Sequence, residues 1–212
     1  MFNNLSLQHI AVMLPALIFA FTIHELSHGV TAYLLGDSTA KNDGRLTLNP
    51  IRHIDPIGLI CIILFSFGWA KPVMVDPLNL RNPKVDMALI SIAGPLSNFI
   101  IAFMVVMLWF PLRQVLPAGT PDWFFNAYLQ FAWLNVLLGV FNLLPIPPLD
   151  GSKVVASVLP DRLYAQYNNA AKYGMGLLLL FMIFGVTTRI IMPIIDAIFE
   201  FFFTIAFMVF LV

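Results

Sequence analysis

The stretch Leu17-Ile-Phe-Ala-Phe-Thr-Ile-His24-Glu25-Leu-Ser-His28-Gly-Val-Thr-Ala-Tyr-Leu-Leu35 places three ionisable side chains inside an apolar run. The surrounding run, residues 9–35, is longer than the about 20 residues that a helix needs to cross the hydrocarbon core of a bilayer. Ionisable groups at that depth are costly and usually have a function. The stretch therefore predicts a membrane-spanning helix that carries a functional site.

The composition of the whole chain supports a lipid environment. Hydrophobic residues make up 60% of the 212 residues and charged residues 10%, against about 45–50% and about 25% in soluble domains. The formal net charge is zero, which gives no basis for nucleic-acid binding, and we expect no nucleic-acid partner. Cys61 is the only cysteine, so the chain has no intrachain disulfide.

The apolar runs predict an all-α polytopic membrane protein, with residues 1–212 as a single transmembrane domain. Pro56 to Trp69 is apolar but has only about 14 residues, which favours a short re-entrant segment over a span. The stretches 44–48 and 71–75 are strand-like, and we expect small β-hairpin elements near the active site, where protein satisfies their backbone groups. About five spanning helices are expected, near residues 9–35, 87–110, 125–144, 173–190 and 191–212.

The distribution of Lys and Arg predicts the orientation. With the N-terminus outside, the cytoplasmic segments 36–56, 70–86 and 145–172 carry nine of these residues, and only Arg113 and Arg189 lie outside. This asymmetry is what the positive-inside rule expects. We therefore expect a multi-pass protein of the cell membrane whose active site lies nearer the cytoplasmic side.

His24-Glu25-Leu-Ser-His28 is an H-E-x-x-H motif within the first predicted helix. Two His side chains at i and i+4 project from one helix face and can bind one zinc ion. Glu25 can then reach a water molecule and act as the general base. The alternative is two histidines packed against polar neighbours, which is less favourable inside a membrane helix because a buried carboxylate without a role is costly there.

A third metal ligand is needed, and Asp150 in Asn142-Leu-Leu-Pro-Ile-Pro-Pro-Leu-Asp150-Gly151 is the best candidate. The alternative for Asp150 is an N-cap of a helix that begins at Gly151. Asp196 and Glu200 compete for the role, but Asp196 enters from the outer face in this topology. Asn142 is a candidate substrate-binding residue, because an amide near the site can bind a peptide backbone or an oxyanion. A helix-to-helix hydrogen bond explains Asn142 equally well.

Two further features are interpreted as structural. His53 lies in a polar connection and is interpreted as an ordinary loop histidine rather than a ligand. Gly94-Pro-Leu-Ser-Asn98 brings small and polar residues into a spanning helix, which close helix packing explains.

Together these motifs resemble the site-2 protease family of intramembrane zinc metalloproteases. The resemblance covers about residues 20–155 in order and implies one zinc ion bound by His24, His28 and Asp150, a catalytic Glu25 and a substrate-lining Asn142. It extends over His24 to Gly29, Gly44 to Pro50, His53 to Gly58, Gly68 to Val73, Arg81 to Pro83, Gly94 to Asn98 and Asn142 to Gly151. No stretch has the length and polarity of the PDZ or CBS domains of some members, so a minimal form is expected.

The expected activity is zinc-dependent hydrolysis of a peptide bond within or near a transmembrane segment of a membrane protein. The expected partners are that substrate and the lipid bilayer, and the sequence does not predict the oligomeric state. One alternative is a catalytically inactive membrane adaptor that binds transmembrane helices. Another is an ion or metal transporter, although no repeat or paired half-helices favour it.

Overall fold

The computed structural model describes residues 7–65 and 68–210, with side chains from residue 11 to residue 64 and from residue 68 to residue 210. The described residues are predominantly helical and include no β-strand. Three short 3-10 helices are Pro50–Arg52, Pro77–Asn79 and Ala171–Tyr173. The α-helices are α1 (Leu7–Leu34), α2 (Thr39–Asn42), α3 (Pro56–Phe65), α4 (Pro83–Val115), α5 (Asp122–Asn142), α6 (Asp150–Val158), α7 (Asp161–Ala170), α8 (Gly174–Ile183) and α9 (Val186–Phe210).

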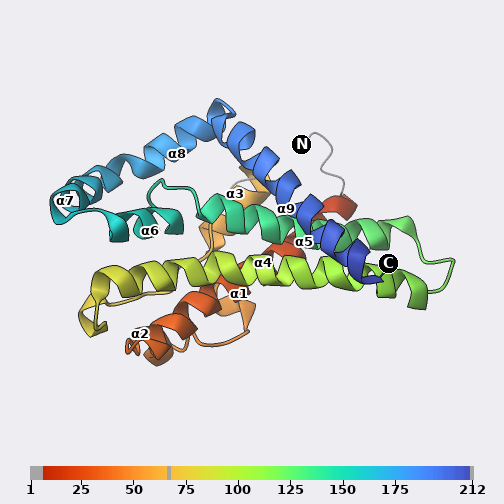
Figure 1. Ribbon diagram of the computed structural model, residues 1–212, viewed down its shortest axis with the longest axis horizontal. Helices are drawn as coiled ribbons and strands as arrows, with labels where there is room; N and C mark the ends of the chain where they lie inside the picture. The colour runs from red at the N-terminus through yellow and green to blue at the C-terminus, as the bar shows by residue number, and fades with distance from the viewer. Residues whose placement is uncertain (1–6, 66–67, 211–212) are drawn as a thin grey trace.

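Four of these helices are long and apolar enough to cross a membrane: 11–34 in α1, then α4, α5 and α9. Helix α4 has 33 residues, about 50 Å at 1.5 Å per residue, and exceeds the about 30 Å of a hydrocarbon core. It packs against α1, α5, α6 and α9 and runs the length of the bundle (Figure 1). Small buried residues such as Ala102, Val106, Ala132 and Val136 let α4 and α5 approach closely.

The fifth predicted span, residues 173–190, is wrong. Helix α8 has only 10 residues, about 15 Å, which is half the length needed to cross. It ends at Ile183 with Phe184 as its C-cap, and Gly185 has a φ of +67°, a left-handed conformation that terminates the helix. The chain turns there, so that α8 and α9 meet at an angle (Figure 1). The last span is α9, which begins at Val186.

The chain on the two sides of α3 lies side by side, because the segment after α3 returns to the loop before it. Ile54 and Ala70 form an antiparallel β-bridge, and the Lys71 N–H donates a 2.9 Å hydrogen bond to the His53 carbonyl. Gly58 on α3 allows the returning chain to pass closely, because a Cβ there would lie 2.1 Å from the Trp69 carbonyl oxygen.

The predicted strands 44–48 and 71–75 are also wrong, because both stretches lack regular secondary structure. Side chains and loop carbonyls, rather than a strand ladder, satisfy several of their backbone groups. Arg45 donates to the Lys71 carbonyl at 2.6 Å, and the Val73 N–H donates to Glu25. The only pairing recorded among the described residues is the single Ile54–Ala70 bridge.

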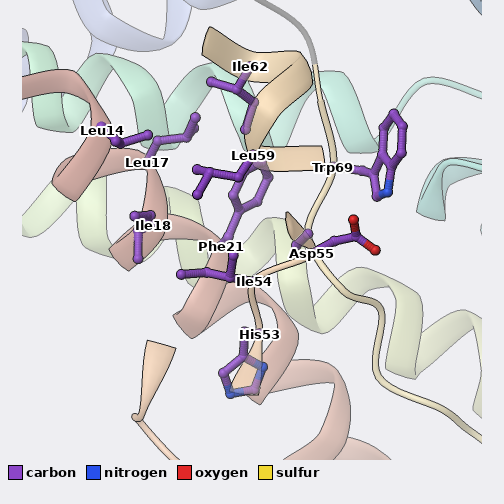
Figure 2. A pocket seen from close by; sticks show the side chains of 11 residues that line it. Leu14, Leu17, Ile18, Phe21, His53, Ile54, Asp55, Leu59, Ile62 and Trp69 are labelled. Carbon is purple, nitrogen blue, oxygen red and sulfur yellow. The ribbon is translucent and has the colours of Figure 1, made fainter. Parts of the chain in front are cut away.

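A narrow cavity of about 10 Å³ lies between α1 and the 53–70 segment, with α1 residues such as Phe21 on one wall (Figure 2). His53 lies at one end of it and is 1% exposed. Its Nε2 lies 2.9 Å from the Thr47 carbonyl oxygen, so the ring ties two loop segments together. His53 is a loop histidine outside the group of possible metal ligands, and its ring is buried.

Candidate metal centre

His24, His28 and Asp150 meet at one point inside the bundle. Each imidazole Nε2 lies 3.1 Å from the same oxygen, Asp150 Oδ2. The three residues are buried, with exposed fractions of 3%, 8% and 8%. In the part of the chain that the structure describes, they form the one group of three or more such side chains with metal-binding geometry.

The hydrogen bonds behind the rings direct the free lone pairs toward this point. His28 Nδ1 lies 2.7 Å from the Ile90 carbonyl oxygen, which can only accept, so Nδ1 carries a proton. His24 Nδ1 lies 2.6 Å from Asn98 Oδ1. A neutral ring protonated at Nδ1 presents its Nε2 lone pair to Asp150, which is itself an acceptor. Two nitrogens and a carboxylate oxygen facing one another fit a zinc ion between them.

Asn98 on α4 and Asn135 on α5 orient the first histidine, and both are 0% exposed. The Asn98 amide donates to Asn135 Oδ1 at 3.0 Å and to the Ala20 carbonyl at 3.3 Å. Asn135 in turn donates to the Phe131 carbonyl at 2.9 Å. Because the Asn98 nitrogen is committed as a donor, its oxygen must accept from His24. The chain of amides therefore connects α1, α4 and α5 behind the site.

The role of Asn98 and Asn135 in orienting His24 was not predicted from the sequence. Asn98 was interpreted as part of a packing motif, and Asn135 was given no role. A usable signal was present, since two amides inside otherwise apolar spans are costly unless each finds a partner.

Gly94 on α4 lies directly over the imidazole rings. A Cβ at this position would lie 2.5 Å from His28 Nε2 and 2.7 Å from His24 Nε2. Real Cβ atoms essentially never make such contacts, and both rings are held by their Nδ1 hydrogen bonds. The absence of a side chain at Gly94 keeps the space between the ligands open.

Asp150 reaches the histidines because α6 begins at this residue and packs against α4. It is not the N-cap, since Leu149 occupies that position and makes no side-chain capping bond. Gly151 allows the close fit, because a Cβ there would lie 2.1 Å from the Leu143 carbonyl oxygen.

Glu25 directly follows His24 on α1 and is 9% exposed. Its Oε2 accepts a 2.8 Å hydrogen bond from the Val73 N–H. The segment after α3 thus orients the carboxylate, a contact that sequence spacing does not reveal.

The remaining candidates lie elsewhere. Asn142 is the last residue of α5, and its amide donates to the Leu138 carbonyl at 2.9 Å within its own helix. Asp196 and Glu200 are exposed on α9 and are not part of the group of three.

The chain is similar in sequence to proteins that are named as zinc metalloproteases. The model of peptidase family M50 matches residues 12–184. The chain is 40% identical to "Putative zinc metalloprotease YwhC" of Bacillus subtilis over 85% of this chain and 84% of the relative. It is 31% identical to "Putative zinc metalloprotease Rip2" of Mycolicibacterium smegmatis over 63% of this chain and 52% of the relative. It is 27% identical to "Zinc metalloprotease MJ0392" of Methanocaldococcus jannaschii over 91% and 48%. No solved structure matches.

Proposed function

Because the chain belongs to peptidase family M50, the site-2 protease family of membrane zinc metalloproteases, we propose that it hydrolyses a peptide bond within or near a transmembrane segment of a membrane-protein substrate. The observation that carries this proposal is the buried convergence of His24 and His28 on α1 with Asp150 at the start of α6, beside Glu25. Helix α1 is long and apolar enough to span a membrane. A peptide bond that reaches this site comes from a segment that can enter an apolar bundle.

In this proposal His24 Nε2, His28 Nε2 and an Asp150 carboxylate oxygen hold one zinc ion per chain. The ion, when bound, polarises a carbonyl and lowers the pKa of a water molecule. Three protein ligands leave a fourth position for water or substrate, which is the arrangement of catalytic zinc sites.

Glu25 serves as the general base in this mechanism. Its carboxylate accepts the proton of the attacking water and later delivers it to the amine of the departing peptide. The Val73 N–H on Oε2 fixes the direction of the carboxylate, so no reorientation precedes the proton transfer. Asn142 is proposed to bind the substrate backbone, for which its amide must exchange its present hydrogen bond to the Leu138 carbonyl.

The proposed substrate must unwind before it is cut. A spanning helix satisfies its own carbonyls by intrahelical hydrogen bonds, so a carbonyl becomes available only where several of these bonds open. The orientation follows from the charges, with the catalytic group nearer the cytoplasmic side of the cell membrane.

The test compares the wild type with Glu25→Gln in cells and analyses membrane peptides by mass spectrometry. Peptides cleaved by the wild type should be cleaved about 10²- to 10⁴-fold more slowly by the variant, while the purified variant retains about one zinc per chain because the ligands are unchanged. Glu200→Gln is the matched control, since Glu200 is exposed on α9. Unchanged cleavage by Glu25→Gln rejects the mechanism. Purified wild type without zinc favours the inactive adaptor.

A further inference from the structure

A second polar feature is an open hollow of about 610 Å³ between the loop after α2 and the segment after α3. Its charged lining consists of Arg45, Arg52, Lys71 and Asp43. Three cations against one carboxylate give the hollow a net positive formal charge. None of these residues belongs to the candidate metal centre.

Arg45 is the part of the hollow that most requires a partner. It is 7% exposed, and its Nη2 donates to the Lys71 carbonyl at 2.6 Å. Its Nε is buried and has no hydrogen-bond partner. Among the described residues no carboxylate forms an ion pair with Arg45. A buried guanidinium is normally paired, because removing its charge from water without compensation costs several kcal/mol. The unpaired, buried Arg45 therefore predicts that the hollow binds an anion.

Exposed apolar side chains stand next to these cations. Ile51 and Met74 line the same hollow and are 77% and 63% exposed. A free inorganic anion gains nothing from apolar neighbours. A phospholipid gains binding free energy from both kinds of neighbour, because its phosphate can contact the cations while its acyl chains cover the apolar side chains.

The charge pattern of membrane proteins argues against a substrate segment as the occupant. If the hollow lies on the cytoplasmic side, the flanks of a substrate's spanning segment there are enriched in Lys and Arg. A basic hollow repels such flanks. Anionic lipids of the cytoplasmic leaflet carry the opposite charge and are attracted to it.

We infer that this hollow binds the phosphate of an anionic phospholipid headgroup, held by Arg45 at its base and by Arg52 and Lys71 at its rim. The same segment reaches the proposed active site, since Arg45 holds the Lys71 carbonyl and the Val73 N–H two residues later bonds to Glu25. A bound lipid would thus stabilise the segment that orients the proposed general base.

The experiment uses the full chain in neutral detergent and native mass spectrometry. Phosphatidylglycerol and phosphatidylcholine with identical acyl chains are titrated separately. Phosphatidylglycerol should occupy one site about tenfold more tightly than phosphatidylcholine. The Arg52→Gln/Lys71→Gln variant should weaken its binding at least about tenfold, because each cation near a lipid phosphate contributes on the order of a several-fold change.

The matched control is Arg162→Gln/Lys172→Gln, which removes the same two charge types away from the hollow and should bind phosphatidylglycerol like the wild type. Arg45→Gln should abolish the preference for phosphatidylglycerol. If Arg45→Gln does not fold, the exposed Arg52 and Lys71 pair still decides the question.

Three results overturn the inference. Equal binding of the two lipids shows that acyl chains alone are recognised. If millimolar inorganic phosphate fully displaces phosphatidylglycerol from the wild type, the hollow is a site for free phosphate. The third result uses an acidic hexapeptide. If this peptide binds the wild type but not the Arg52→Gln/Lys71→Gln variant, and if it displaces no lipid, the hollow binds an acidic protein segment and the lipid binds elsewhere. Because lipid binding is measured without any proteolysis, its failure leaves the proposed activity untouched.

Discussion

At the level of single residues, the protonation of the two imidazoles is set by atoms outside the metal centre. Ile90 contributes a carbonyl that can only accept, and Asn98 contributes an oxygen whose amide nitrogen is already committed to Asn135 and Ala20. Such outer partners hold a ligand in the metal-binding tautomer and orientation. Asn98 therefore acts as a positioning residue for His24.

Replacing Asn98 should weaken metal binding. Asn98→Leu removes the acceptor on His24 Nδ1, and we expect zinc affinity to fall about 10- to 100-fold, the range for loss of an outer-shell partner. Competition with a chelator on purified protein measures the affinity. Asn98→Asp keeps an acceptor oxygen toward His24 and should recover part of the loss.

The matched control is Ser97→Ala on the preceding residue, because Ser97 Oγ donates to the Gly94 carbonyl of its own helix. It should leave zinc affinity unchanged. Equal affinities for wild type and Asn98→Leu would show that the Asn98 contact has no role in orienting the ligand.

These residues also explain how far the site can be predicted from sequence. His24, Glu25 and His28 are found because helical spacing alone places them together. Asp150 lies 126 residues from His24, so it is found only as the best carboxylate near the right depth. Asn98 and Asn135 are missed because a lone amide in a helix has no characteristic spacing. The Val73 N–H is missed because a backbone group carries no sequence signal.

Asp37 gives a pH-dependent contribution to stability. It is fully buried and accepts hydrogen bonds from Thr39 N and Oγ1, Asp76 N and Asn79 Nδ2 at 2.5 to 3.0 Å. Burial alone would raise its pKa, but these donors outweigh it and lower the pKa below 3.8. When the pKa of a carboxyl group is lower in the folded state than in the unfolded state, ionisation of the group stabilises the fold. This stabilisation is complete at pH values above the unfolded-state pKa, and it is lost as the pH falls through the folded-state pKa.

We therefore expect the melting temperature in detergent to fall below pH 3.8, and Asp37→Asn to remove part of this acid sensitivity. At neutral pH, Asp37→Asn should itself cost about 1–3 kcal/mol, because it leaves donors without an acceptor. Thermal unfolding at a series of pH values measures both effects. Asp161→Asn, at an exposed position, should keep the wild-type profile. An identical acid profile for Asp37→Asn and wild type would contradict the prediction.

At the level of secondary-structure elements, apolar run length predicts the long helices but not where a run breaks. The sequence places a break between spans 173–190 and 191–212, yet the structure breaks earlier, where Gly185 separates α8 from α9. Glycine adopts a left-handed conformation without steric cost, so its backbone angle depends on tertiary packing that the sequence alone does not specify. The strand predictions fail for a related reason, since Arg45 and Glu25 satisfy loop backbone groups that a strand partner would otherwise need.

The re-entrant path of α3 can be tested with one disulfide. Ile54 and Ala70 form a bridge flanked by the Lys71–His53 bond, which makes them a non-hydrogen-bonded pair with Cα atoms about 4.5 Å apart. That separation is within the range for a disulfide. In a Cys61→Ser background, Ile54→Cys/Ala70→Cys should therefore cross-link under mild oxidation, detected by mass spectrometry of the intact chain.

The control pair Ile54→Cys/Gly119→Cys should not cross-link, since Gly119 lies in the connection between α4 and α5, beyond the far end of α4. Free thiols at positions 54 and 70 under the same oxidation would show that the segment does not return beside its starting point.

At the level of the whole molecule, the four long helices change the expected orientation of the C-terminus. With the N-terminus outside, four spans place both chain ends outside, whereas the five spans expected from sequence place the C-terminus inside. Arg189 then lies in the first turn of α9, at the inner end. The inner segments carry ten Lys and Arg and the outer ones only Arg113, a stronger positive-inside asymmetry than nine against two. The start of α1 and the end of α9 lie toward the same end of the bundle (Figure 1).

We therefore expect a cysteine added after Val212, in a Cys61→Ser background, to react with a membrane-impermeant maleimide on intact cells. Gly119→Cys should react likewise, because the connection between α4 and α5 lies outside in both layouts. Asp161→Cys should react only after permeabilisation. A C-terminal cysteine that behaves like Asp161→Cys would restore the five-span layout.

Gly94 has a consequence for recognising pseudoenzymes. A methyl group at this position would occupy the space between His24 Nε2 and His28 Nε2, so a chain can keep every ligand and still exclude the ion. A homologue with H-E-x-x-H and the distant aspartate intact but alanine at the Gly94 position is therefore expected to be catalytically dead. Counting ligands alone would misclassify it as an active protease.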